Sequence, residues 1–158
     1  MLNPHEQLIE EFYAGFAIHD AETMLSCYHE DIVFSDPVFG TLHGQDVADM
    51  WRMLIERSKG HLEVEFSNIK ADNKTGSARW IATYNFSRTN RKVVNSVESR
   101  FVFQDDLIIR HSDSFNVHNW SKQALGLSGL LFGWTPFLQK KIQKQSIALL
   151  RKYQSIQS

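Results

Sequence analysis

Residues 100–117, RFVFQDDLIIRHSDSFNV, decide the fold, because apolar and polar residues alternate in two runs. Gln104, Asp105 and Asp106 separate the runs and are typical of a turn. A period of two indicates strands with one buried face, here two neighbouring antiparallel strands. We expect the second strand to span residues 107–118. Its inward face would hold Leu107, Ile109, His111, Asp113, Phe115 and Val117.

Working outward, earlier segments alternate in the same way and predict further strands. The first third of the chain instead has apolar residues at helical spacing. It predicts helices beginning after Asn3, after Asp20 and near Val47, with one short strand at 32–34. This order predicts an α+β fold, in which a curved antiparallel sheet covers three N-terminal helices. The other predicted inward strand residues are Val64, Phe66, Trp80, Ala82, Tyr84, Phe86, Val97, Ser99, Phe101 and Phe103.

Length and composition are those of one ordinary globular domain: 158 residues, of which 42% are hydrophobic and 22% charged. The single cysteine excludes an internal disulfide, and acidic residues interrupt the apolar positions near the N-terminus. We therefore expect a cytoplasmic protein. Because glycine-rich phosphate loops and histidine clusters are lacking, we expect no cofactor and no metal ion. Nor do we expect nucleic-acid binding.

Charge is divided unevenly along the chain. All 18 acidic residues lie at or before Asp113, whereas 6 of the 17 basic residues follow it. We divide the chain into a domain at 1–120 and a tail at 121–158. The tail should consist of an irregular apolar loop at 125–134 and a basic amphipathic helix beginning at Thr135-Pro136. We expect this helix to pack on the domain; the alternative is an anionic membrane surface, with Leu131, Phe132, Trp134 and Phe137 inserted.

Two segments, HEDIVFSDPVFGTLHG at 29–44 and IIRHSDSFNVHNW at 108–120, occur within an element order that resembles the nuclear-transport-factor-2-like cone. The first resembles the segment with the catalytic Asp-Pro of ketosteroid isomerases, which implies a base at Asp36. The second resembles the last strand of SnoaL-like polyketide cyclases. In that group and in limonene epoxide hydrolases a nearby aspartate is catalytic, which implies Asp113. The tyrosine and protonated aspartate of ketosteroid isomerases fall on Phe12 and Ser99, so steroid isomerisation is not expected.

Candidate catalytic residues are Asp113, His111 and Asp36. Two residues apart on a strand, His111 and Asp113 share the apolar face, where ionisable groups are costly unless paired or hydrated. They form either an acid–base pair or a buried polar network that fixes the sheet. Asp36 before Pro37 is either a turn residue or a base at a cavity mouth. The candidate ligand-binding residues are Tyr13, Trp51, Trp80, Tyr84, Ser99 and Phe101.

Two functions fit these residues. The first is a cofactor-free acid–base enzyme of isomerase, cyclase or hydrolase type, acting on a small apolar carbonyl or epoxide compound. The second is a non-catalytic ligand-binding or dimerisation domain. We expect a homodimer through the outer sheet face, which mixes Arg110, Ser112, Ser114, Asn116 and His118.

Overall fold

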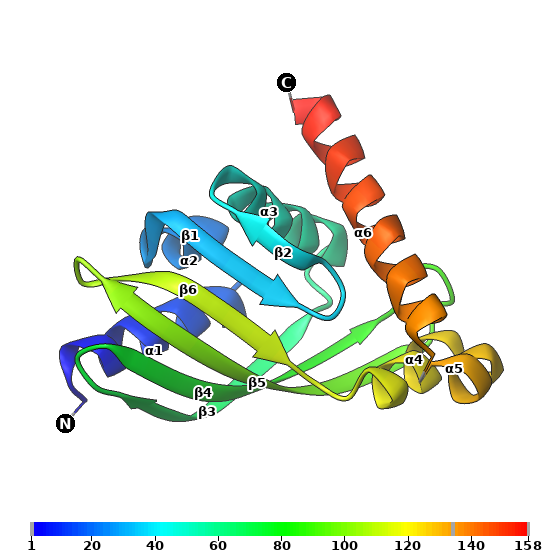
Figure 1. Ribbon diagram of the computed structural model, residues 1–158, viewed down its shortest axis with the longest axis horizontal. Helices are drawn as coiled ribbons and strands as arrows, with labels where there is room; N and C mark the ends of the chain where they lie inside the picture. Colours follow the sequence, from blue (N-terminus) through cyan, green and yellow to red (C-terminus); the bar gives the residue numbers. More distant parts are fainter. Residues whose placement is uncertain (1, 134, 158) are drawn as a thin grey trace.

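The computed structural model describes residues 2–133 and 135–157 and has the predicted α+β architecture (Figure 1). One curved, unclosed sheet has the strand order β2-β1-β6-β5-β4-β3, and α1, α2 and α3 lie on its concave side. The elements are α1 (Pro4–Ala17), α2 (Ala21–Ser26), β1 (Tyr28–Asp36), β2 (Gly40–His43), α3 (Gln45–Ser58), β3 (Glu63–Ala71), β4 (Thr75–Asn85), β5 (Lys92–Gln104), β6 (Leu107–Ser114), α4 (Val117–Leu125), α5 (Leu127–Phe132) and α6 (Pro136–Gln157).

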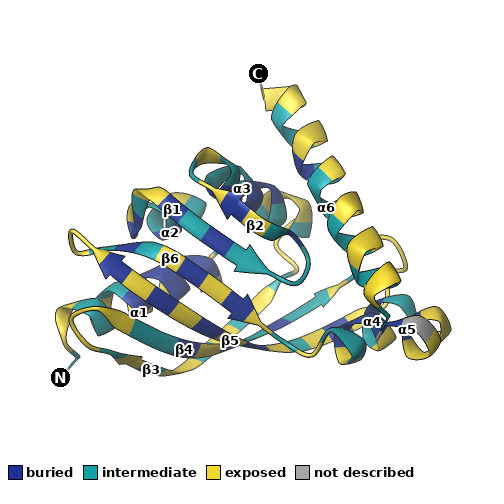
Figure 2. Ribbon diagram, viewed as in Figure 1, coloured by how far each residue is buried: buried dark blue, intermediate teal, exposed yellow. Residues whose placement is uncertain are grey.

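Local sequence signals place the first two helices as predicted. The Asn3 side chain accepts a hydrogen bond from the backbone N–H of Glu6, whose carboxylate reaches back to the Asn3 N–H, completing a capping box ahead of Pro4. Asp20 caps α2 through the backbone N–H of Thr23. The apolar faces of α1 and α3 then enter the main core against the inward residues of the sheet, as the buried stripes in Figure 2 show.

The expectation of a wholly antiparallel sheet is wrong at one pair of strands. β1 lies parallel to β6, because the chain crosses after β1 and β2 to the far edge and then returns strand by strand. The short strand expected at 32–34 is longer and begins at Tyr28, and β2 was not predicted. These differences matter because the parallel pairing aligns Ser35 with Ser112 and brings the ends of β1 and β6 together.

The last predicted strand also differs in two places. In its pairing with β5 the register shifts so that Ile108, rather than Ile109, is buried. β6 ends at Ser114, not at residue 118, because the Asn116 side chain caps α4 through the backbone N–H of Asn119. Asn116 and His118 therefore leave the outer strand face, where Ser112 remains exposed. The dimer expected through that face stays a prediction.

The segment expected as an irregular loop contains a helix, α5. Gly126, at φ +69°, separates α4 from α5, and the backbone carbonyl of Ser121 passes so close to Gly129 that no side chain would fit there. Trp134 of the same expected loop lies outside the described residues. Of the helices described, none has both the length and the apolar character to cross a membrane.

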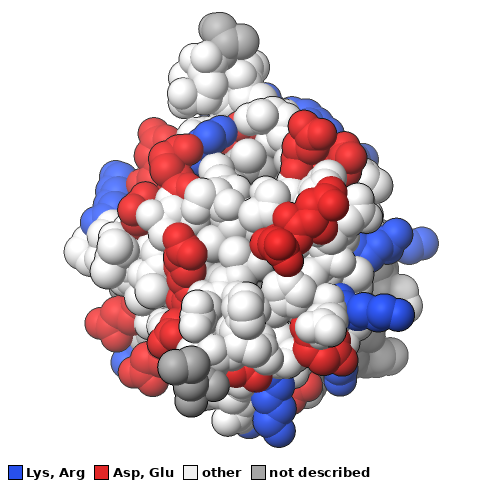
Figure 3. Space-filling model, turned by 90° about the vertical axis from the view of Figure 1, so that its left-hand side faces the viewer, with Lys and Arg blue, Asp and Glu red and all other residues white. Residues whose placement is uncertain are grey.

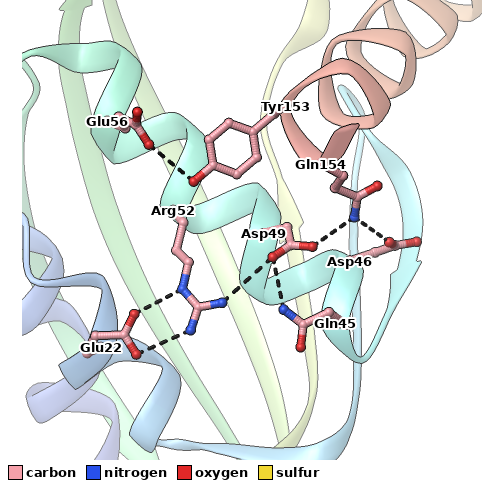
Figure 4. Close-up of polar contacts among 8 residues, drawn as sticks. All are labelled: Glu22, Gln45, Asp46, Asp49, Arg52, Glu56, Tyr153 and Gln154. Carbon is pink, nitrogen blue, oxygen red and sulfur yellow. Dashed lines mark hydrogen bonds and ion pairs between the residues drawn. The ribbon is translucent and has the colours of Figure 1, made fainter. Parts of the chain in front are cut away.

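The carboxyl-terminal half of α6 lies along α3. Leu150 is fully buried in the main core, and Ile147, Leu149 and Tyr153 pack against that core. Polar contacts flank this apolar seam. Figure 4 shows those of Gln154 with Asp46 and Asp49 and of Tyr153 with Glu56, and Arg151 also donates to Asp46.

Candidate active site

A chain of buried hydrogen bonds begins at Trp51 and ends at Asp113. The indole N–H of Trp51 donates to the Tyr28 hydroxyl oxygen at 3.0 Å, which leaves the Tyr28 proton for His111 Nδ1 at 2.7 Å. His111 Nε2 then lies 2.8 Å from Asp113 Oδ1. This pattern assigns the ring proton of His111 to Nε2 and makes His111 a donor to the carboxylate.

A second chain reaches the same oxygen from the opposite side. Tyr13 donates to Ser99 Oγ at 2.6 Å and the indole of Trp80 donates to it at 3.0 Å. Ser99 in turn donates to Asp113 Oδ1 at 2.5 Å. The last donor of each chain, Ser99 in one and His111 in the other, therefore donates its hydrogen bond to Oδ1 of Asp113. Within the described part of the chain, Asp113 Oδ2 receives no hydrogen bond.

Aromatic rings enclose His111, whose side chain has no exposed surface. The ring of Phe101 lies 4.6 Å away, that of Phe34 5.1 Å and that of Phe12 5.4 Å, centre to centre. In this structure His111 contacts Asp113 and the enclosing rings, and its role as a catalytic partner of Asp113 stays a prediction.

Asp36 lies at the end of β1, one residue beyond the aligned pair Ser35 and Ser112, so it faces the same side as Asp113. Its Oδ1 accepts hydrogen bonds from the backbone N–H groups of Val38 and Phe39, at 2.9 and 2.6 Å. Burial raises the pKa of Asp36 to about 7; these backbone donors oppose the rise and the negative charge of Asp113 adds to it. A carboxyl group with such a pKa suits proton transfer near neutral pH.

Tyr84 completes this end of the site. Its hydroxyl oxygen accepts a hydrogen bond from the indole of Trp120 at 2.8 Å, and no described residue accepts the Tyr84 proton. Burial raises the pKa of Tyr84, and the charge of Asp36 contributes, so Tyr84 remains a donor at neutral pH. Tyr84 and Ile142 of α6 both pack against a small apolar cluster that includes Trp120. Gln143 donates to the carbonyl of Pro37 at 3.2 Å, so α6 lies next to the Asp36 turn.

Residues 9–111 match the family model for the SnoaL-like domain, which covers well over half of the chain. The chain belongs to the SnoaL-like family. No curated protein matches its sequence.

Solved structures with the same fold include the following. TerC, co-crystallized with polyporic acid, is 17% identical over 77% of this chain and 98% of its own, with a TM-score of 0.66. A protein from Xanthomonas campestris, provisionally named a polyketide cyclase, is 17% identical over 76% of this chain and 96% of its own, with a TM-score of 0.62. An M. tuberculosis LEH-like epoxide hydrolase is 22% identical over 81% and 95%, with a TM-score of 0.61. At these identities the likeness concerns the fold alone.

The sequence of this SnoaL-like chain predicted most of the buried polar and aromatic residues, but not which of them contact one another. Of the candidate ligand-binding residues, Tyr13, Ser99 and Trp80 hold Asp113. Phe101 packs on His111, and Trp51 reaches it through Tyr28. The remaining candidate, Tyr84, does not bond this network and is near enough to Asp36 for the charge of Asp36 to raise its pKa.

Sequence reasoning missed Tyr28 and Trp120. The helical spacing of Tyr28 after Met24 and Leu25 predicts a place for it on the second helix, yet Tyr28 begins β1 opposite Ile108. The alternation of Tyr28 with the buried residues of β1 was a signal, obscured by the register shift in that strand. Trp120 had no such signal. Its position depends on the start of α4 at Val117, where the alternation of residues had predicted a continuing strand.

Two hollows open elsewhere on this SnoaL-like domain. One of about 320 Å³ is lined by Ser96, Glu98, Ser114, Phe115 and Asn116. The other, of about 500 Å³, lies between α1 and the β3, β4 and β5 strands. Neither is lined by Asp36 or Asp113. Among the described residues, no cluster of three His, Cys, Asp or Glu side chains is suited to hold a metal ion.

Replacing Tyr28 with phenylalanine tests the buried network. The variant removes one hydroxyl and leaves His111 Nδ1 and Trp51 Nε1 without their partner. We expect the free energy of unfolding to fall by about 1–3 kcal/mol, the usual cost of unpaired buried polar groups. Urea denaturation followed by circular dichroism measures it.

The matched control is Tyr153→Phe. The Tyr153 hydroxyl bonds Glu56 at the surface, so its removal should lower the free energy of unfolding by less than about 0.5 kcal/mol. Equal losses in both variants would contradict a tightly coupled network.

Proposed function

We propose that this chain is a cofactor-free acid–base enzyme that transfers a proton on a small apolar molecule carrying a carbonyl or an epoxide. The observation that carries the proposal is the pairing of two inward carboxylates, Asp36 and Asp113, at adjoining strand ends. In each, one oxygen is held by donors and the other accepts no hydrogen bond from a described residue. Burying a carboxylate oxygen without a hydrogen bond is unfavourable unless that oxygen binds a substrate or water.

The roles follow from the proton inventory. The ionised Asp36 removes a proton from the carbon next to the carbonyl, using the oxygen that the backbone leaves unbonded. The Tyr84 hydroxyl, which already accepts from Trp120, donates to the carbonyl oxygen as negative charge develops there. Asp113, fixed by Ser99 and His111, keeps its second oxygen for the substrate or a water molecule. Returning the proton to another carbon would complete an isomerisation without a cofactor.

The similar folds give the proposal its substrate class. Two of them, one provisionally named a polyketide cyclase and the other an LEH-like epoxide hydrolase, have names that describe chemistry on carbonyl-rich or epoxide compounds. Our proposal extends that class to this chain because its carboxylates occupy the inner face of the same scaffold. Apolar core residues, Phe34 and Phe115 among them, pack in this part of the molecule and suit a substrate with little polar surface.

A non-catalytic domain is the second candidate, and one observation favours it. Apart from Asp113 Oδ2, to which no described residue donates, the buried network of Tyr13, Ser99, Asp113, His111 and Tyr28 forms without a ligand. A buried network of this kind can also fix the fold without taking part in a reaction. The two candidates differ in whether protons exchange at the site.

Solvent deuterium exchange separates them. The protein is incubated in deuterated water with a panel of cyclic enolisable ketones, and deuterium at the carbon next to the carbonyl is followed by NMR. A parallel panel of epoxides in ¹⁸O-labelled water detects hydrolysis. We expect one of these compounds to react faster with the protein than without it. Binding of panel compounds with no exchange or hydrolysis would favour the non-catalytic domain.

A further inference from the structure

An apolar surface protrudes at the end of the molecule where α5 leads into α6. We call it the α5 tip and define it by the exposed residues Leu127, Leu130, Leu131 and Phe137, which are 70%, 47%, 53% and 79% exposed. The three leucines share one face of α5, since Leu130 and Leu131 follow Leu127 by three and four residues. Large apolar side chains gathered at one site on a surface mark an interaction surface.

Positive charge surrounds the α5 tip. Arg88 donates to Gln145 of α6, and Arg91 donates to the backbone carbonyl of Gln123 in α4, so the β4–β5 hairpin adds its bases to those of the helices. The sequence has no acidic residue at 86–97 or at 114–158. We call these bases the basic rim: Arg88, Arg91, Lys92, Lys122, Lys140, Lys141 and Lys144, all exposed.

The opposite end of the molecule is acidic. There α1 begins beside the β5–β6 turn, with His5 paired to Asp106 and His29 to Asp105. Figure 3 shows this end, and acidic side chains crowd its face. The molecule is therefore electrically polarised, and an anionic surface would attract the α5 tip and repel the far end.

We infer that the α5 tip binds the surface of an anionic phospholipid bilayer. Its leucines and Phe137 would enter the headgroup region while the basic rim contacts lipid phosphates and carboxylates. Of the apolar residues of α6 only Phe137, at its beginning, takes part, because farther along the helix Leu150 is buried in the core. This division joins the two roles considered for the tail: the end of α6 packs on the domain, and its beginning faces the membrane.

A second copy of the chain fits this surface less well. Two α5 tips meeting about a twofold axis would bring two basic rims together, and like charges at short range repel. A tip meeting the acidic end of another copy would generate open chains of molecules. An anionic bilayer instead offers negative charge and an apolar layer in one plane.

Vesicle co-sedimentation tests the inference on the full chain, independently of any activity. Phosphatidylcholine vesicles with and without phosphatidylserine are compared at physiological ionic strength. We expect binding to the mixed vesicles only. Lys140→Glu with Lys141→Glu should weaken that binding at least about tenfold. Lys70→Glu with Lys74→Glu, the control in exposed residues of β3 and of the turn that follows it, should leave the binding nearly unchanged.

A second variant set tests the apolar part. Leu127→Gln, Leu130→Gln and Phe137→Gln together should also abolish sedimentation, whereas Ile18→Gln with Ile156→Gln, at equally exposed sites elsewhere, should not. Light scattering reports the oligomeric state of each variant. Absence of binding to mixed vesicles would overturn the inference. So would a change of oligomeric state in the α5-tip variants, because the surface would then join protein copies.

Discussion

Replacing Asp36 with asparagine is expected to lower turnover of any substrate found in the exchange panel by about 10²–10⁴-fold, the usual contribution of a general base. Asparagine keeps the Oδ1 acceptor for Val38 and Phe39, so the turn should survive. In the parent, turnover should rise with pH through about 7 as Asp36 ionises. Steady-state rates across a pH series measure both effects. Unchanged turnover in the variant would remove Asp36 from the mechanism.

The pH dependence of the unfolding free energy tests the pKa of Asp36 independently of turnover, with the same substitution. The folded protein holds the Asp36 proton more tightly than the unfolded chain, because the pKa rises from its ordinary 3.8 to about 7. Stability of the parent should therefore decline as pH rises from about 4 to 7 and then level off. The Asp36→Asn variant lacks the titrating group and should show no such decline. We expect it to gain about 1–3 kcal/mol relative to the parent across this range, somewhat less than the full shift allows because water reaches part of the group.

The sequence was sufficient for the sheet wherever alternation ran without interruption. Ser99, Phe101, His111 and Asp113 all face inward as predicted, because a period of two leaves little freedom once one face is buried. It failed where contacts between distant segments decide. The parallel pairing of Tyr28 with Ile108 joins residues far apart in the chain, and no local pattern encodes it.

For the candidate site, the sequence named the acids but left their roles open. Asp36 could be a turn residue or a base, and the structure gives it the geometry for both: Oδ1 holds the turn and Oδ2 is unoccupied by described donors. His111 and Asp113 could be a reacting pair or a fixed network. The side chains of His111 and Asp113 are both buried, at 0% and 3% exposed, and they differ in that Asp113 keeps an oxygen to which no described residue donates. Such distinctions depend on side-chain packing, which spacing along a strand does not specify.

Replacing Leu150 with alanine is expected to cost about 2–5 kcal/mol of unfolding free energy, the range for a fully buried leucine. The effect should fall first on α6. The polar contacts of α6 with α3 are those of Gln154 and Tyr153 in Figure 4 and the ion pair of Arg151 with Asp46. They lie mostly near the surface, where such pairs contribute about 0–1 kcal/mol each. Urea denaturation gives the total loss. Hydrogen exchange should show α6 opening before the sheet.

The matched control is Ile156→Ala on the same helix, where the side chain is 71% exposed and the loss should stay below about 0.5 kcal/mol. Opening of α6 also bears on the site, because Gln143 bonds Pro37 beside Asp36. In the Leu150→Ala variant we therefore expect faster amide exchange at Val38 and Phe39, whose N–H groups bond Asp36. Faster exchange in α6 alone, with these two amides still protected, would separate the helix from the site and leave its role purely one of stability.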